Sequence, residues 1–185
     1  MKRYLFVLLA FMPMLVIAQT GFEPQIKVSY ELGIDDDKNQ SFGGEFLAGY
    51  RISENFRLGA GVGIFWCKHL YESAHYNSLI HYYSDEYRET ASYIPVFANG
   101  KYNFVSSGSW KPYLSFDLGY SIFNAASDYA KENKLGLFIK PAFGVDYAIG
   151  KGDLFFEIGY KYQDRKFYEE KMGYSQLTFS VGYQF

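Results

Sequence analysis

Three histidines are the side chains most able to support chemistry, and all of them fall in one polar segment. His69, His75 and His81 lie within residues 67–92. Neighbouring residues that could bind a metal or act as nucleophiles are Cys67, Glu72, Ser73, Ser78, Ser84, Asp85 and Glu86. The six-residue spacing of the histidines matches no zinc motif, and no His-x-Ser motif supplies a nucleophile with an adjacent base. The sequence therefore predicts no metal site, no cofactor and no catalytic residue, and we expect a protein that is not an enzyme.

A second set of candidate residues is charged, and its members recur at alternate positions within otherwise apolar segments. The set is Lys27, Glu31, Glu45, Arg51, Arg57, Lys101, Asp117, Lys140, Asp146, Glu157 and Lys161. Its positive and negative charges nearly balance, as an enclosed network requires, because buried charges are stable only when they are paired. We predict that these residues form a charge network in the interior of the protein.

The elements that must position these charges are β-strands, because the dominant pattern beyond residue 24 has a period of two. The C-terminus shows it best, where Leu177, Phe179, Val181, Tyr183 and Phe185 alternate with small or polar residues. Eight strands are predicted, over residues 26–34, 46–52, 56–66, 94–104, 114–122, 135–149, 154–162 and 177–185. Within them every charge lies on one face, and the opposite face is apolar.

Length and composition exclude several classes of protein. The chain has 185 residues, of which 21% are aromatic and 21% charged, and its mean hydropathy is −0.17. Disordered chains are poor in aromatic residues, and a single cysteine excludes a disulfide scaffold. A net charge of −2 argues against a nucleic-acid partner. Only one segment is apolar enough to span a membrane as a helix, and it is N-terminal, so a helical membrane bundle is excluded as well.

The N-terminal segment has the pattern of a secretory signal peptide. Lys2 and Arg3 supply positive charge, Tyr4–Ile17 is apolar, and Ala18 is a small residue suited to a cleavage site. A transmembrane anchor is the alternative, but the apolar stretch is short and lacks a charged flank at its far end. We expect residues 1–18 to be removed, which leaves residues 19–185 as one domain.

The face that points outward distinguishes a soluble barrel from a membrane barrel. A soluble barrel turns its apolar face inward, whereas a membrane barrel turns it toward lipid. The balanced charges and many glycines of the polar face suit a narrow enclosed space, and the aromatic residues near strand ends suit interfacial girdles. Short connections at 53–55, 105–109 and 150–153 alternate with longer ones at 35–40, 67–92, 123–134 and 163–173. We predict an all-β fold, an eight-stranded antiparallel up-and-down transmembrane β-barrel.

The chain beyond residue 18 resembles the small outer-membrane β-barrels of the OmpX- and OmpA-like type, including the Bacteroidetes-type outer membrane protein beta-barrel domain. The most specific element is the last strand, because Leu177, Phe179, Val181, Tyr183 and Phe185 resemble the C-terminal assembly signal of such proteins. The resemblance implies an outer-membrane location, contact with outer-membrane lipid, and recognition of Phe185 by the barrel-assembly machinery.

The resemblance implies no single function, because such barrels include structural proteins, adhesins, binding proteins and a few lipid A enzymes. About eight strands enclose an interior just wide enough for side chains to fill. We therefore expect a non-enzymatic protein that is structural or binds an extracellular ligand through its long loops. The tyrosine-rich segment 67–92 suits recognition, or it extends two strands as a hairpin above the membrane. A narrow small-solute channel and a lipid A-modifying enzyme remain alternatives.

Overall fold

A computed structural model describes residues 21–34, 40–74, 84–124, 133–167 and 170–185. It describes side chains for the same residues, except those at 68–74, 84–90, 123–124, 133–134, 165–167 and 170–172. The signal peptide predicted at residues 1–18 lies outside the described residues. The described residues include no helix long and apolar enough to cross a membrane.

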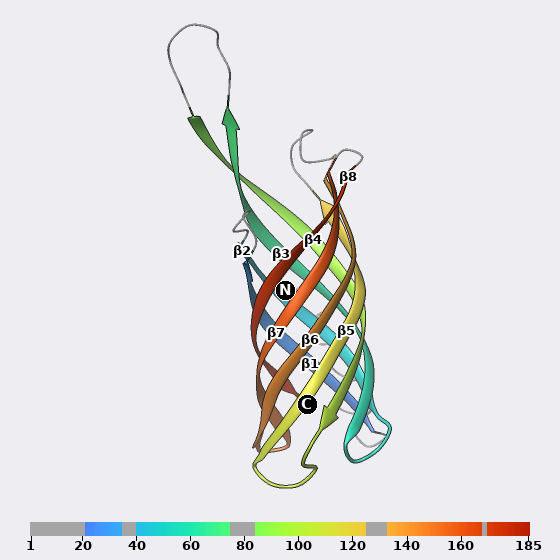
Figure 1. Ribbon diagram of the computed structural model, residues 1–185. Coiled ribbons are helices and arrows are strands. Elements are labelled where there is room, and N and C mark those ends of the chain that lie inside the picture. The colour runs from blue at the N-terminus through green and yellow to red at the C-terminus, as the bar shows by residue number, and fades with distance from the viewer. Residues whose placement is uncertain (1–20, 35–39, 75–83, 125–132, 168–169) are drawn as a thin grey trace, which may run out of the picture.

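The described chain forms a closed barrel of eight strands (Figure 1). The strands are β1 (Phe22–Gly33), β2 (Gln40–Arg51), β3 (Phe56–Ala74), β4 (Ser84–Asn103), β5 (Trp110–Asn124), β6 (Asn133–Ile149), β7 (Gly152–Phe167) and β8 (Glu170–Gln184). Each strand pairs antiparallel with the next, and β8 pairs antiparallel with β1. The predicted up-and-down barrel is confirmed.

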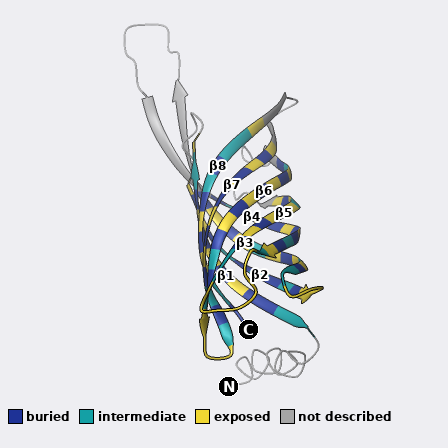
Figure 2. Ribbon diagram, turned by 60° about the horizontal axis from the view of Figure 1, so that its bottom comes forward, coloured by how far each residue is buried: buried dark blue, intermediate teal, exposed yellow. Residues whose placement is uncertain are grey.

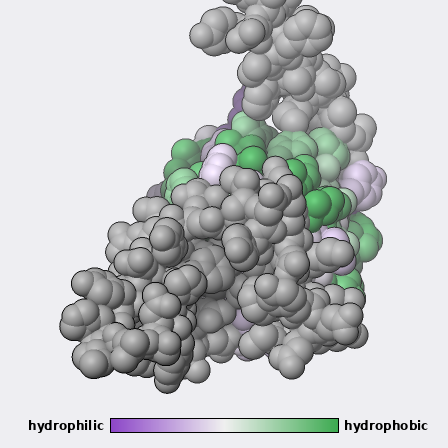
Figure 3. All heavy atoms as spheres, turned by 90° about the horizontal axis from the view of Figure 1, so that it is seen from above, coloured by the Kyte–Doolittle hydropathy of each residue, from purple (hydrophilic) through white to green (hydrophobic). Residues whose placement is uncertain are grey.

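The apolar face of every strand points outward and the polar face points into the barrel, as predicted. Val28, Phe143 and Ile158 are about half exposed, whereas Lys27 and Glu157 are buried. Buried and exposed residues alternate along the strands (Figure 2), and hydrophobic residues predominate among those that are coloured in the view from the loop end (Figure 3). An outward apolar face that surrounds a polar interior is the arrangement of a barrel in lipid.

The strands extend further toward the loop end than the sequence predicts. β2 begins at Gln40 and not at Phe46, because its first residues include Gly43 and Gly44 and give a weak alternating pattern. The connection predicted over 67–92 is largely strand, since β3 continues to Ala74 and β4 begins at Ser84. The strands therefore extend as the hairpin interpretation of this segment predicts, and its role in recognition stays a prediction. The connections predicted over 123–134 and 163–173 are shortened in the same way.

At the opposite end the strands are joined by tight turns. Residues 150 and 151 connect β6 to β7. Gly150 has a φ of +65°, which lies in the left-handed region that two-residue hairpin turns require and that glycine adopts without strain. The segment between β4 and β5 also contains a left-handed glycine, Gly108. These turns hold neighbouring strands in a fixed register at this end of the barrel.

Aromatic rings inside the barrel lie against glycines on the facing strand. The directly paired positions are Gly43 with Phe65, Gly61 with Phe97, Gly119 with Phe138, Tyr113 with Gly144, and Phe155 with Gly182. A Cβ atom at Gly61 would lie 2.3 Å from Cζ of Phe97, well inside van der Waals contact. The glycines on the polar face thus leave the space that the inward-pointing rings occupy.

Candidate functional site

The candidate site is the polar interior of the barrel. Ten of the eleven residues predicted to form a charge network are buried there. The exception is Arg51, the last residue of β2, whose side chain is 46% exposed and pairs with Glu23 at the turn end. Its place in an interior network is therefore a wrong prediction. Alternation assigned Arg51 to the correct face of the sheet, but the strand reaches the barrel rim at that residue.

Five residues from five strands form a central cluster. Lys27 Nζ lies 2.9 Å from Glu45 Oε2, 3.6 Å from Asp117 Oδ2 and 3.6 Å from Glu157 Oε1. Lys140 Nζ lies 2.7 Å from Asp117 Oδ2 and 3.7 Å from Glu45 Oε1. All five side chains are buried, and together they cross the barrel interior. The cluster holds three carboxylates and two ammonium groups, so it carries one surplus negative charge.

A second cluster lies nearer the turn end and carries a surplus positive charge. Lys101 Nζ lies 2.6 Å from Asp146 Oδ1. Arg57 donates from Nη1 to Gln184 Oε1 at 2.7 Å and from Nη2 to Asn99 Oδ1 at 3.5 Å. Within the described residues Arg57 forms no ion pair with a carboxylate. The two side-chain oxygens that accept hydrogen bonds from this buried guanidinium are therefore amide oxygens.

Asn99 joins the two clusters. Its Oδ1 atom accepts from Arg57, and its Nδ2 atom donates to Asp117 Oδ1 at 2.5 Å. The surplus positive charge of Arg57 is thereby connected through one amide to the cluster that carries the surplus negative charge. Because an uncompensated buried charge is costly, this connection helps to balance the charge of a guanidinium that forms no direct ion pair among the described residues.

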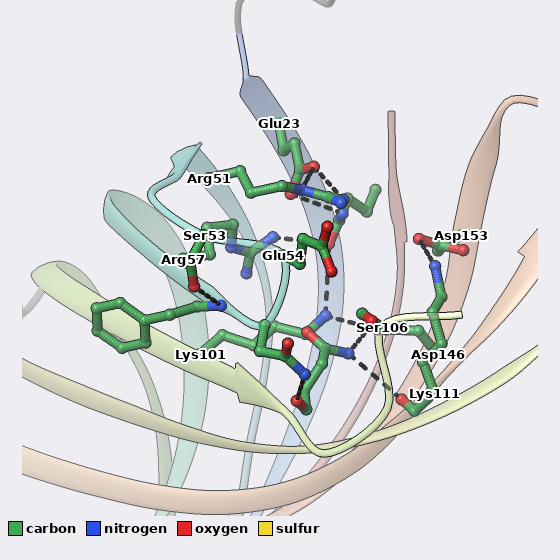
Figure 4. A pocket seen from close by; sticks show the side chains of 14 residues that line it. Glu23, Arg51, Ser53, Glu54, Arg57, Lys101, Ser106, Lys111, Asp146 and Asp153 are labelled. Atoms are coloured by element: carbon green, nitrogen blue, oxygen red, sulfur yellow. Dashed lines mark hydrogen bonds and ion pairs between the residues drawn. The ribbon is translucent and has the colours of Figure 1, made fainter. Parts of the chain in front are cut away.

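The turn end opens into a shallow polar recess, seen closely in Figure 4. Its walls include Arg57, Lys101 and Asp146 from the second cluster, together with the ion pair of Lys111 Nζ with Asp153 Oδ2 at 2.7 Å. The recess has a free volume of about 20 Å³, enough for about one water molecule. Charged side chains from several strands converge on this recess.

A third group fills the interior toward the loop end. Lys161 Nζ lies 3.0 Å from Glu31 Oε1 and 3.1 Å from the hydroxyl of Tyr93, which itself donates to Glu31 Oε2. The ring of Phe65 stacks on that of Tyr93 with centroids 5.0 Å apart. Beyond them lie the buried apolar side chains of Cys67, Ala91 and Leu135. An ion pair packed against aromatic and apolar side chains thus occupies this part of the interior.

Each buried lysine also lies over an aromatic ring. Lys101 Nζ is 3.9 Å from the ring centroid of Tyr113, and Lys161 Nζ is 4.7 Å from that of Tyr93. The ring of Phe97 lies within 6 Å of both lysines of the central cluster. The negative faces of such rings attract cations, more strongly when the groups are desolvated. Both the aromatic rings and the carboxylates therefore stabilise the buried lysine ammonium groups.

Several residues that contact the interior charge network are not among those predicted from the sequence. Tyr93 and Tyr113 come directly before the strands predicted at 94–104 and 114–122, and extending the alternation by one residue would have placed both on the inner face. Asn99 lies on the inner face of a predicted strand, but as an uncharged residue it gave no electrostatic signal. Gln184 likewise belongs to the inner face of the last strand. Its role depends on partners distant in the sequence.

The predictions made for the histidine-containing segment stay predictions. His75 and His81 lie outside the described residues, and the side chain of His69 is not described. Among the described residues, no group of three or more His, Cys, Asp or Glu side chains has the arrangement of a metal site. Cys67 is buried, and its thiol donates to the carbonyl oxygen of Ala91 at 3.4 Å.

The residues predicted as an assembly signal lie on the outward face of β8, and Phe185 directly follows the end of that strand. Phe179, Val181 and Phe185 are exposed, whereas Leu177 and Tyr183 are partly covered by their neighbours. The rings of Tyr183 and Phe185 meet edge to face with centroids 4.9 Å apart. The five side chains therefore form one continuous apolar row, and its recognition by an assembly machine stays a prediction.

β3 and β4 project beyond the rest of the barrel (Figure 1). They pair with each other as far as Ala74 and Ser84. The pairing of β2 with β3 ends at Gln40 and Lys68, and the pairing of β4 with β5 ends at Asn124 and Ser92. We call residues 69–74 and 84–91 the projecting hairpin. Each of its two strands is paired on one side only among the described strands.

Comparison with known proteins extends the resemblance. A family model described as the outer membrane protein beta-barrel domain matches residues 4–185. A search of curated proteins finds no match. Among solved structures, Neisserial surface protein A is similar with a TM-score of 0.58 and 16% identity, over 89% of this chain and 96% of that chain.

Two further structures are less similar. The N-terminal β-barrel domain of Pseudomonas aeruginosa OprF has a TM-score of 0.45 and 15% identity, over 88% of this chain and 97% of that chain. The outer membrane enzyme PagL has a TM-score of 0.42 and 12% identity, over 85% of this chain and 97% of that chain.

Proposed function

The chain belongs to the outer membrane protein beta-barrel domain family, and on that premise we propose that it is a non-enzymatic outer-membrane barrel whose projecting hairpin binds extracellular partners. The barrel serves as a closed support, and the hairpin presents the binding surface. Residues 1–18 direct export, and the outward row of β8 is recognised by the assembly machinery. These roles follow the sequence patterns described above.

The observation that carries this proposal is the unequal length of the strand pairings. β3 and β4 remain paired with each other beyond Lys68 and Ser92, where their pairing with β2 and β5 ends. A strand paired on one side presents a row of backbone N–H and C=O groups that an extended peptide can join. We therefore propose that the partner is an extended polypeptide segment that adds to one edge of the hairpin.

The filled interior supports a binding role over transport. The central cluster crosses the barrel from β1, β2, β5, β6 and β7, and buried aromatic rings lie between the charged levels. A solute passing through would have to separate several desolvated ion pairs, each of which is costly to break. A narrow channel is therefore the weaker alternative. Catalysis is also disfavoured, because most of the buried ionisable groups of the described interior pair with one another, and the turn-end recess has room for only about one water molecule.

The test uses the protein in lipid nanodiscs and a displayed library of random decapeptides. In a shortened variant, a two-residue Asn-Gly turn replaces residues 69–89 and joins Lys68 to Thr90, which are directly paired. We expect peptides that bind the full protein and not this variant. Heat-modifiable gel mobility, retained in the variant, is the control for an intact barrel.

Backbone methylation of a selected peptide identifies the mode of binding. Alternate N–H groups of an added strand point toward the edge that it joins. N-methylation of one set of alternate residues should therefore abolish binding, whereas methylation of the other set should leave it largely unchanged. Equal binding to the shortened variant would refute the role of the hairpin, and indifference to both methylation patterns would refute strand addition.

A further inference from the structure

The pairing of β1 with β8 differs from the other seven pairings in the barrel, because these two strands are not consecutive in the chain. In a hairpin, the turn type and loop length fix the register. No such connection joins β1 to β8. A two-residue slip at this seam would leave every side chain on its correct face, yet it would change the stagger of the strands, which is linked to barrel tilt and size.

Two pairs of identical polar residues bridge the seam inside the barrel. Gln25 pairs in register with Gln184, and its Nε2 atom donates to Gln184 Oε1 at 2.6 Å. Ser29 pairs in register with Ser180, and their hydroxyl oxygens lie 2.8 Å apart. All four side chains are buried. The two pairs are separated by four residues on each strand, so both form in the same register.

Gln184 also connects the seam to the wall beyond it. Its Oε1 atom accepts from Arg57 Nη1 at 2.7 Å, in addition to the bond from Gln25, and its Nε2 atom donates to Glu23 Oε2 at 3.0 Å. Lys101 Nζ lies 3.4 Å from the same Oε1 atom. The last residue of β8 therefore bonds to side chains of β1, β3 and β4, and all of these bonds depend on where β8 stops relative to β1.

We propose that the inward face of β8 carries a register determinant for barrel closure, formed by Gln184 and Ser180 with their partners Gln25 and Ser29. It is separate from the outward apolar row on the same strand. After a slip of two residues, the outward row would still place apolar side chains opposite apolar side chains of β1, because its members are all apolar. The inward polar residues would lose their partners after such a slip. They therefore select one register from those that the alternating pattern permits.

Slipped registers lose both polar pairs. A slip in one direction places Gln25 opposite Gly182 and Ser29 opposite Thr178. A slip in the other direction places Ser29 opposite Gly182 and Gln184 opposite Lys27, which would draw Gln184 away from Arg57. In either case the side-chain amide of Gln25 loses its partner, whereas Ser29 faces the hydroxyl of Thr178 in the first register and a glycine in the second. Unsatisfied polar groups in a buried site are costly.

The test measures the register by disulfide cross-linking in outer-membrane fractions, in a Cys67→Ala background that removes the only native cysteine. Val28→Cys with Val181→Cys reports the native register, because these positions are directly paired. Val28→Cys with Phe179→Cys, or with Tyr183→Cys, reports the two slipped registers. Directly opposed residues have Cβ atoms close enough for a disulfide, whereas diagonal pairs lie about 7–8 Å apart.

Each reporter is placed in the parent barrel and in a variant that carries Gln25→Ala, Ser29→Ala, Ser180→Ala and Gln184→Ala. The parent should cross-link almost only through the native reporter. In the variant, the ratio of slipped to native cross-links should rise about tenfold, because losing one or two net hydrogen bonds shifts an equilibrium by roughly that factor. The control is Gln163→Ala with Ser121→Ala, which removes one residue of each type at buried positions of β7 and β5, outside the β1–β8 pairing.

If the fourfold variant does not yield a folded barrel, Ser29→Ala with Ser180→Ala supplies the measurement, because it removes one pair and retains the bonds of Gln184. A rise in slipped cross-links above the control supports the proposal in either variant. Cross-linking confined to the native reporter, at the level of the control, would overturn it and would assign the register to the outward row or to the backbone alone.

Discussion

β3 and β4 each belong to two different environments along their length. Within the barrel they pair on both sides, and their inward residues include Arg57 and Lys101 in buried polar contacts. In the projecting hairpin the same strands are paired on one side among the described strands. Burial and pairing fix the barrel portion in one arrangement, whereas the projecting portion retains backbone groups for a partner. Stability and recognition are thus separated along the length of two strands.

The largest effect is expected from removing one charge of the central cluster. Asp117→Ala takes away the closest partner of Lys140, 2.7 Å away, and the acceptor for Asn99. Breaking a buried ion pair by removing one member costs about 3–5 kcal/mol, because the other charge stays buried. Urea unfolding in lipid vesicles should show a loss of that size. A loss below about 1 kcal/mol would mean that the cluster contributes little to holding the barrel together.

A smaller loss is expected where a glycine accommodates an aromatic ring. In Gly61→Ala the new Cβ atom would lie 2.3 Å from Cζ of Phe97, and such overpacking costs about 1–3 kcal/mol. The matched control is Gly44→Ala, whose Cβ would meet only the carbonyl oxygen of Lys27, at 3.8 Å. The same urea titration should show a clear loss for the first substitution and little change for the second. Equal effects would contradict the proposed fit of ring and glycine.

The rim should be less sensitive than the interior, although its ion pair also joins two strands. Arg51 pairs with Glu23, but its side chain is 46% exposed, so water competes for the charge of the guanidinium. Arg51→Ala is therefore expected to cost about 0–1 kcal/mol, and raised salt should reduce even that difference. A loss comparable with that of Asp117→Ala would show that the network extends to the rim.

The same contrast explains how far the sequence alone could predict the molecule. The alternation of Leu177–Phe185 specifies which face is apolar, and it predicted both the barrel and the buried position of residues such as Lys27. It cannot specify the height of a residue along the barrel axis, so it predicts an interior position for Arg51 although β2 ends at that residue. The partners of Gln184 come from β1, β3 and β4, and contacts between segments so distant in sequence leave no local pattern. Tyr93 and Tyr113 did leave one, just outside the predicted strand limits.

The smallest effect on stability is expected from shortening the projecting hairpin. Replacing residues 69–89 with a two-residue turn removes strand segments that pair with each other alone among the described strands, and leaves the glycine–aromatic contacts and the charge clusters in place. Unfolding in urea should change by no more than about 0.5 kcal/mol, as for other surface changes remote from buried features. Binding of the selected decapeptides should be lost in the same variant. A large loss of stability would show that the hairpin supports the barrel as well, and the separation of the two roles along β3 and β4 would then be incorrect.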